Sequence, residues 1–178
     1  MKRKLLVVLF AVAAAIAAPA EVKDAGANGF TITHSFTVKG TTNEVFAKVV
    51  AVGSWWSNEH TYSGDARNMA LEARPGGCWC EKLPAGGGVA HMHVATVIPG
   101  QLLVMSGGLG PLQQMGATGS MTFKLAQSAE GTTVTFTYAV SGYAPGGMNA
   151  LAAPVDSVLM NAVGRLQSYI ETGSAAKK

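Results

Sequence analysis

The chain has 178 residues, of which 48% are hydrophobic and 13% are charged, with a formal net charge of +3. Lys2, Arg3 and Lys4 account for that excess, since the other 10 Lys and Arg residues balance the 10 Asp and Glu residues. Without a basic cluster interleaved with aromatic residues, we expect no nucleic-acid partner. The length suits one folded domain.

Residues 1–20 have the pattern of a secretory signal peptide. A basic start precedes an apolar run over residues 5–18, and Ala18-Pro19-Ala20 is a small-residue cleavage signal before Glu21. We therefore expect an exported protein, periplasmic or secreted, with no stable membrane anchor after cleavage. Behind the signal we expect a linker over residues 21–29, one domain over residues 30–172 and a tail over residues 173–178.

The folded part begins with a strand and two short helices. Residues 30–39 alternate apolar and polar side chains, which predicts a strand with His34 on its apolar face as a core residue. The run Thr41-Thr42-Asn43-Glu44 resembles a capping box and starts a helix that Gly53 is expected to end. A second helix at residues 55–57 carries two tryptophans that point in different directions, one into the core and the other towards a cavity or solvent.

The polar loop that follows has two interpretations. His60, Tyr62 and Asp65 are candidates for the mouth of a cavity. They also fit an ordinary loop with Asp65 as a turn residue, and we favour that interpretation because polar loops need no function.

The rest of the chain alternates strands and turns until a final helix. Strands are expected at residues 69–73, 78–83, 89–97, 101–106, 119–125 and 132–140, and a long amphipathic helix at 148–171. Pro154 falls near the first turns of that helix, where it marks a kink or a late start. The glycines of residues 107–110 follow no strand–helix unit of the nucleotide-binding type, so they indicate no phosphate loop.

Residues 77–97 carry most of the chemistry of the sequence. Two strand-forming runs flank a Pro/Gly turn, which predicts a hairpin. Residues two apart on a strand share a face. Cys78 and Cys80 therefore point to one side of the first strand, and His91 and His93 point to one side of the second. A four-residue turn would bring all four together as a zinc or copper(I) site.

A five-residue turn, Pro84–Gly88, gives a different site, and we predict this one. It places Glu81 opposite His91, Trp79 opposite His93, and Cys80 opposite Met92, so the cysteines share an apolar face with Met92 and Val94. An inward carboxylate needs a partner, and the pairing predicts a raised pKa for His91. We expect reduced thiols, because a Cys78–Cys80 disulfide would need a bend or bulge in the strand.

The order of elements resembles a known superfamily. The Glu44-Val45-Phe46 helix, the Trp55-Trp56 pair, the Pro75-Gly76-Gly77 and Pro99-Gly100 turns and the amphipathic final helix are similar to those of the SRPBCC (START-like) superfamily. Its branch of heat-shock-chaperone ATPase activator homology domains is the most similar in pattern. The resemblance covers about residues 30–172 and implies an α+β helix-grip fold: a curved antiparallel sheet of about seven strands wrapped around the long C-terminal helix.

That fold implies a cavity between sheet and helix, and we expect it to bind a small hydrophobic or aromatic ligand without a cofactor. The candidate wall residues are Trp56, Trp79, Glu81, His91, Met105, Phe123, Tyr138, Leu151 and Val155. The alternatives are a cyclase-, dehydratase- or hydrolase-like enzyme in which Glu81 orients His91 as a general base, and metal binding by Cys78, Cys80, His91 and His93. The sequence does not define an oligomeric state.

The signal-peptide pattern makes a direct prediction about the mature protein. When the chain is expressed in a host that exports it, we expect N-terminal sequencing of the exported protein to start at Glu21. Exported protein that still began at Met1 would contradict the cleavage.

Overall fold

The computed structural model describes residues 21–175; the predicted signal peptide lies outside the described residues. The strands are β1 (Glu21–Gly26), β2 (Gly29–Val38), β3 (Met69–Leu71), β4 (Cys78–Lys82), β5 (Gly88–Ile98), β6 (Leu102–Gly107), β7 (Thr118–Ser128) and β8 (Gly131–Ser141). The helices are α1 (Thr42–Val50), α2 (Val52–Trp55) and α3 (Asn149–Thr172), with short 3₁₀ turns η1 (Asn58–His60), η2 (Ala66–Asn68) and η3 (Gly110–Gln113).

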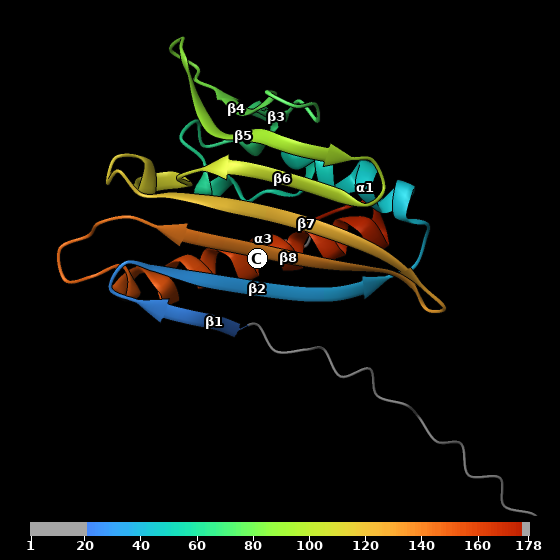
Figure 1. Ribbon diagram of the computed structural model, residues 1–178. Helices are drawn as coiled ribbons and strands as arrows, with labels where there is room; N and C mark the ends of the chain where they lie inside the picture. The colour runs from blue at the N-terminus through green and yellow to red at the C-terminus, as the bar shows by residue number, and fades with distance from the viewer. Residues whose placement is uncertain (1–20, 176–178) are drawn as a thin grey trace, which may run out of the picture.

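All eight strands form one antiparallel sheet in the order β1-β2-β8-β7-β6-β5-β4-β3. Figure 1 shows α3 lying behind this sheet, and it contacts β1, β2, α1 and α2. The expected helix-grip fold is therefore confirmed. Among residues 21–175 no helix is both long and apolar enough to span a bilayer.

The core lies between the sheet and α3, and the alternation of β2 and β8 builds it. Ile32 faces Tyr138 across the two strands, and His34 faces Phe136. These four side chains are buried, whereas the threonines between them are only half-buried. The core position expected for His34 is confirmed, and its Nε2 lies 2.9 Å from Asp156 Oδ1 on α3.

The two short helices pack under the sheet and lead the chain to the cavity. The capping box is present: Thr41 and Glu44 exchange hydrogen bonds at the start of α1. The helix ends at Ala51 instead of the expected Gly53, which lies inside α2. Arg165 on α3 donates to the carbonyl oxygens of Trp55 and Trp56, so α3 holds the end of α2 in place.

Helix α3 runs without a break through Pro154 and ends at Gly173, which adopts the left-handed conformation with φ 78°. The middle of its apolar stripe is buried, including Leu159 and Leu166. Leu151, Val155 and Val158 belong to the same stripe, yet they stay half-buried. Apolar side chains that face the sheet without being covered indicate an unfilled space at this end of the helix.

One prediction about the N-terminal region was wrong. Residues 21–29 were expected to be a linker, but residues 21–26 form β1, which pairs antiparallel with β2 at the edge of the sheet. The segment Glu-Val-Lys-Asp-Ala-Gly is polar and short. It forms a strand because the edge of β2 offers backbone hydrogen-bond partners. The sequence of β1 alone does not reveal that this edge is available.

Candidate functional site

The β4–β5 hairpin does not have the register of the predicted Pro84–Gly88 loop, and it has the register of the four-residue alternative only at Cys78 and Trp79. Lys82 pairs with Gly88, Glu81 with Val89 and Cys80 with Ala90, so the loop is Leu83–Gly87. The register then shifts, and Trp79 pairs with Met92 and Cys78 with His93. His91 is the extra residue of a β-bulge. The predicted Pro84–Gly88 loop was wrong, because neither register allowed for a bulge.

The bulge changes which side chains face the core. His91 and Met92 are consecutive in sequence, yet both are buried, at 3% and 1% exposure. His93 is exposed on the outer face, opposite Cys78. We had predicted that Met92 shares the face of the cysteines. It packs instead on the inner face with Trp79. The predicted contact between Glu81 and His91 forms despite the wrong register.

The cysteines were expected to be reduced, and this was wrong: Cys78 and Cys80 form a disulfide, with Cα atoms 5.3 Å apart. An extended strand places residues i and i+2 about 6.6 Å apart, so β4 is contracted where it faces the bulge. The bridge lies on the outer face of the sheet, and His91 lies on the inner face. The four residues of the alternative metal site are thus not assembled, and residues 21–175 contain no cluster of three or more His, Cys, Asp and Glu side chains suited to a metal ion.

Glu81 is the most buried charged group of the site, at 1% exposure. Its Oε1 accepts the backbone N–H of Ser63 at 2.5 Å, and its Oε2 accepts that of Tyr62 at 3.1 Å and lies 2.9 Å from His91 Nε2. Burial raises the pKa of Glu81, but the hydrogen bonds from Ser63, Tyr62 and His91 outweigh burial and hold this pKa below its ordinary value. Glu81 is therefore a carboxylate at neutral pH.

His91 is neutral at the same pH. Burial lowers its pKa below 6.5, and the nearby Glu81 carboxylate offsets only part of this effect. The raised pKa that we predicted was wrong, because desolvation outweighs the attraction of the carboxylate. The ring lies beside Trp79 and Tyr62, with centroid distances of 5.7 and 5.9 Å.

A cavity of about 450 Å³ opens beside this pair, between α3 and the loops on the inner face of the sheet. Its apolar walls come from α3 and from the segment around η3. Polar groups gather at one part of the wall, near His91. The lining residues are Trp56, Glu59, His60, Thr61, Tyr62, His91, Leu109, Gly110, Pro111, Leu112, Met115, Leu151, Pro154, Val155, Val158 and Leu159.

The nine predicted wall residues divide into two groups. Trp56, His91, Leu151 and Val155 line the cavity. The other five are buried and do not line it: Trp79, Glu81, Met105, Phe123 and Tyr138. Two of the buried residues position the wall: Glu81 holds His91, and the Tyr138 hydroxyl donates to Gly107 O while accepting the N–H of Leu109, each at 3.0 Å.

Two loops supply many of the wall residues that the prediction missed, and α3 supplies Pro154, Val158 and Leu159. His60 and Tyr62 line the cavity, although we favoured an ordinary loop there, whereas Asp65 caps η2 and pairs with Arg67. Leu109, Leu112 and Met115 come from the glycine-rich segment. These apolar residues lie between two strands and belong to neither. Apolar residues in such a connection could have indicated a cavity wall.

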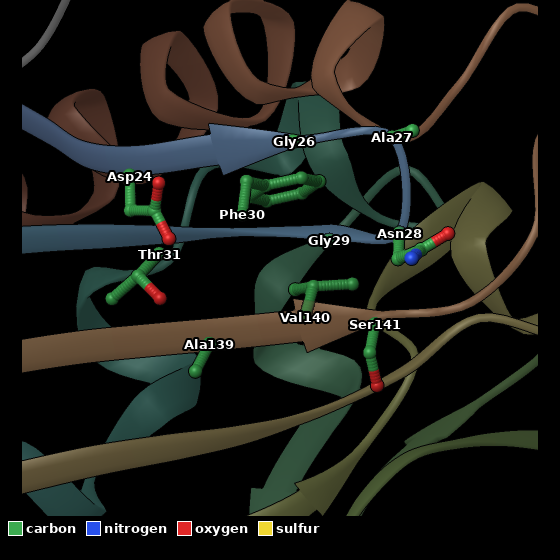
Figure 2. A pocket seen from close by; sticks show the side chains of 10 residues that line it. All are labelled: Asp24, Gly26, Ala27, Asn28, Gly29, Phe30, Thr31, Ala139, Val140 and Ser141. Carbon is green, nitrogen blue, oxygen red and sulfur yellow. The ribbon is translucent and has the colours of Figure 1, made fainter.

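A second hollow, of about 470 Å³, lies at the β1 edge of the sheet (Figure 2). It follows the turn between β1 and β2, and Asp24, Asn28, Thr31 and Ser141 are among its lining residues. Asp24 is the only ionisable side chain there. We place the candidate site in the α3 cavity, which contains a buried acid–imidazole pair and apolar walls.

Comparisons with known proteins support the fold. No family model matches the chain, and no curated protein matches it. Solved structures do: EF2215 from Enterococcus faecalis, a conserved protein of unknown function, superposes with a TM-score of 0.59 at 13% identity, covering 89% of this chain and 79% of that one.

Two further structures extend this likeness. The Aha1 dimer from Colwellia psychrerythraea gives a TM-score of 0.57 at 18% identity, covering 80% of this chain and 97% of that one. DynU16, from the dynemicin biosynthetic locus, gives 0.57 at 22% identity and covers 83% of this chain. The matched region spans only 49% of DynU16. At these identities the comparisons establish the helix-grip fold, and they assign no activity.

The Glu81 network predicts a large and pH-dependent effect on stability. Replacing Glu81 by Gln presents an amide N–H to N–H donors, so we expect the free energy of unfolding at pH 7 to fall by about 3 kcal/mol. Lys82→Gln, an exposed neighbour on β4, should change it by less than about 0.5 kcal/mol. Urea denaturation of both variants measures this.

The pH dependence has a defined sign. Because folding lowers the pKa of Glu81, the carboxylate's contribution is fully present above 4.5 and is lost as pH falls through the lower folded pKa. The difference between wild type and Glu81→Gln should therefore shrink in acid. Equal effects of the two substitutions at pH 7 would contradict the role of Glu81.

Proposed function

We propose that this protein is an exported binding module of the SRPBCC superfamily that holds a small hydrophobic or aromatic ligand in the α3 cavity. One observation carries the proposal: the apolar stripe of α3 is left uncovered at Leu151, Val155 and Val158, where a cavity of about 450 Å³ opens. That volume lies within the range of about 300–1,000 Å³ typical of small-molecule pockets.

The composition of the wall supports an apolar ligand. Leu109, Leu112 and Met115 face the cavity from one side, and the α3 residues from the other. Burying apolar ligand surface against such walls contributes about 25 cal/mol per Å² before the costs of binding.

Two features support export. The first is the signal-peptide pattern of residues 1–20. The second is the Cys78–Cys80 disulfide, since disulfides persist mainly in oxidising compartments. The ligand would accordingly be met in the periplasm or outside the cell.

The contact between Glu81 and His91 favours a second function, acid–base catalysis. A carboxylate that fixes a neutral imidazole at the wall of an apolar cavity suits a general base. We would test this with 5-nitrobenzisoxazole, an apolar compound that opens when a base removes its C–H proton. His91→Gln should then lower the rate by about a hundredfold. Equal rates in the wild type and the variant would contradict general-base catalysis by His91.

The binding proposal is tested with N-phenyl-1-naphthylamine, a neutral probe whose emission rises in apolar surroundings. We expect one-to-one binding that quenches tryptophan fluorescence, because Trp56 lines the cavity. Val155→Phe should weaken binding at least about tenfold by filling the cavity.

Met160→Phe is the matched control, since Met160 lies on the same helix and is 50% exposed. It should bind the probe as the wild type does. Circular dichroism and thermal melting show whether both variants keep the fold. If folded Val155→Phe binds the probe with unchanged affinity, the ligand does not occupy this cavity.

A further inference from the structure

The imidazole of His91 reaches the cavity in one defined protonation state. Glu81 already accepts two backbone N–H groups, at 2.5 and 3.1 Å, which favour its ionised form. A carboxylate is only an acceptor, so the 2.9 Å contact with His91 Nε2 requires a proton on Nε2. In the neutral ring the other nitrogen, Nδ1, is then an acceptor with a free lone pair.

Nδ1 is not used by the protein. Within residues 21–175 no hydrogen bond joins it to another group, and it is absent from the buried polar atoms that lack a partner, so it remains accessible. The ring lines the cavity, and most of the other lining residues are apolar, with the polar ones at residues 59–62. A group that approaches Nδ1 from the cavity therefore meets an acceptor in surroundings where an unmatched polar contact is costly.

We propose that the cavity selects ligands that present a hydroxyl or similar hydrogen-bond donor to His91 Nδ1, with Glu81 as the positioning residue that sets this preference. This inference rests on the proposed function and makes it narrower. A phenol or an alcohol on an apolar ring system fits. An ether or ketone of the same shape fits less well, because its oxygen would face the Nδ1 lone pair without a proton between them.

The experiment is a competition series at pH 7.5 in which naphthalenes displace N-phenyl-1-naphthylamine from the wild-type protein. 2-Naphthol and 2-methoxynaphthalene share the ring system, and only the first can donate a hydrogen bond. We expect 2-naphthol to bind about fivefold to tenfold more tightly than 2-methoxynaphthalene. In His91→Phe the ratio of the two affinities should fall to about that of their partition into an apolar solvent.

Glu81→Gln gives a sharper test. The glutamine amide can donate to Nε2 through its NH₂ group, and in that arrangement the ring proton lies on Nδ1, which becomes a donor. The preference should then reverse in favour of 2-acetylnaphthalene, an acceptor. Lys82→Gln should keep the wild-type ratios. Because Glu81→Gln also weakens the fold, ¹⁵N spectra of wild-type protein labelled at histidine provide an independent reading, in which Nδ1 should be unprotonated.

The outcomes separate this inference from the function on which it rests. If all the naphthalenes displace the probe with ratios that follow hydrophobicity alone, the donor preference is refuted while the binding module stands. A protonated Nδ1 in the wild-type spectrum also refutes it. If neither the probe nor any naphthalene binds, the proposed function fails, and the inference fails with it.

Discussion

The β-bulge at His91 is the constraint on which the candidate site depends. In a regular strand His91 and Met92 would face opposite sides of the sheet. With the bulge both face inward, so Met92 packs against Trp79 in the core while His91 reaches Glu81. The bulge is also in contact with a side chain outside the sheet. The Gln113 side chain donates to Ala90 O and lies 3.4 Å from His91 O, which links the bulge to η3 and thereby to the opposite wall of the cavity.

Burial of Glu81 is tolerated because the polar loop before β3 folds over it. Tyr62 and Ser63 turn their backbone N–H groups towards the carboxylate, and the same turn brings the Tyr62 ring to the cavity beside His91. The Trp56 indole donates to His60 O at 2.8 Å and holds the start of this loop. The acid therefore organises the polar part of the wall as well as the tautomer of the imidazole. An apolar residue in its place would leave the N–H groups of Tyr62 and Ser63 without the acceptor that they use.

Periodicity predicted the fold well, and contacts between distant segments explain what it missed. Alternation in β2 and β8, the capping box at Thr41 and the stripe of α3 each depend on local pattern, and each is present. The register of the hairpin depends on the bulge, which no local pattern marked, so the predicted state of the cysteines was wrong with it. The predicted pKa of His91 was wrong for another reason, because burial lowers it more than the Glu81 carboxylate raises it. Strand β1 depends on the free edge of β2. The glycine-rich segment is a packing feature: a Cβ at Gly108 would collide with Ala117 O, so close approach of two loops requires glycine there.

The disulfide explains why an acid–imidazole pair and two cysteines can occupy one short hairpin without forming a metal site. Cys78 and Cys80 alternate with Trp79 and Glu81, so period two sends the sulfur atoms to the outer face and the indole and carboxylate inward. The bond between the two sulfur atoms holds β4 in a contracted form opposite the extra residue of β5. The bulge bends β5 at the same place, so the contraction of β4 fits this bend. The bridge thus restrains from the outside the same bulge that places His91 inside. Oxidation of the cysteines and the geometry of the imidazole are consequences of one local distortion of the sheet.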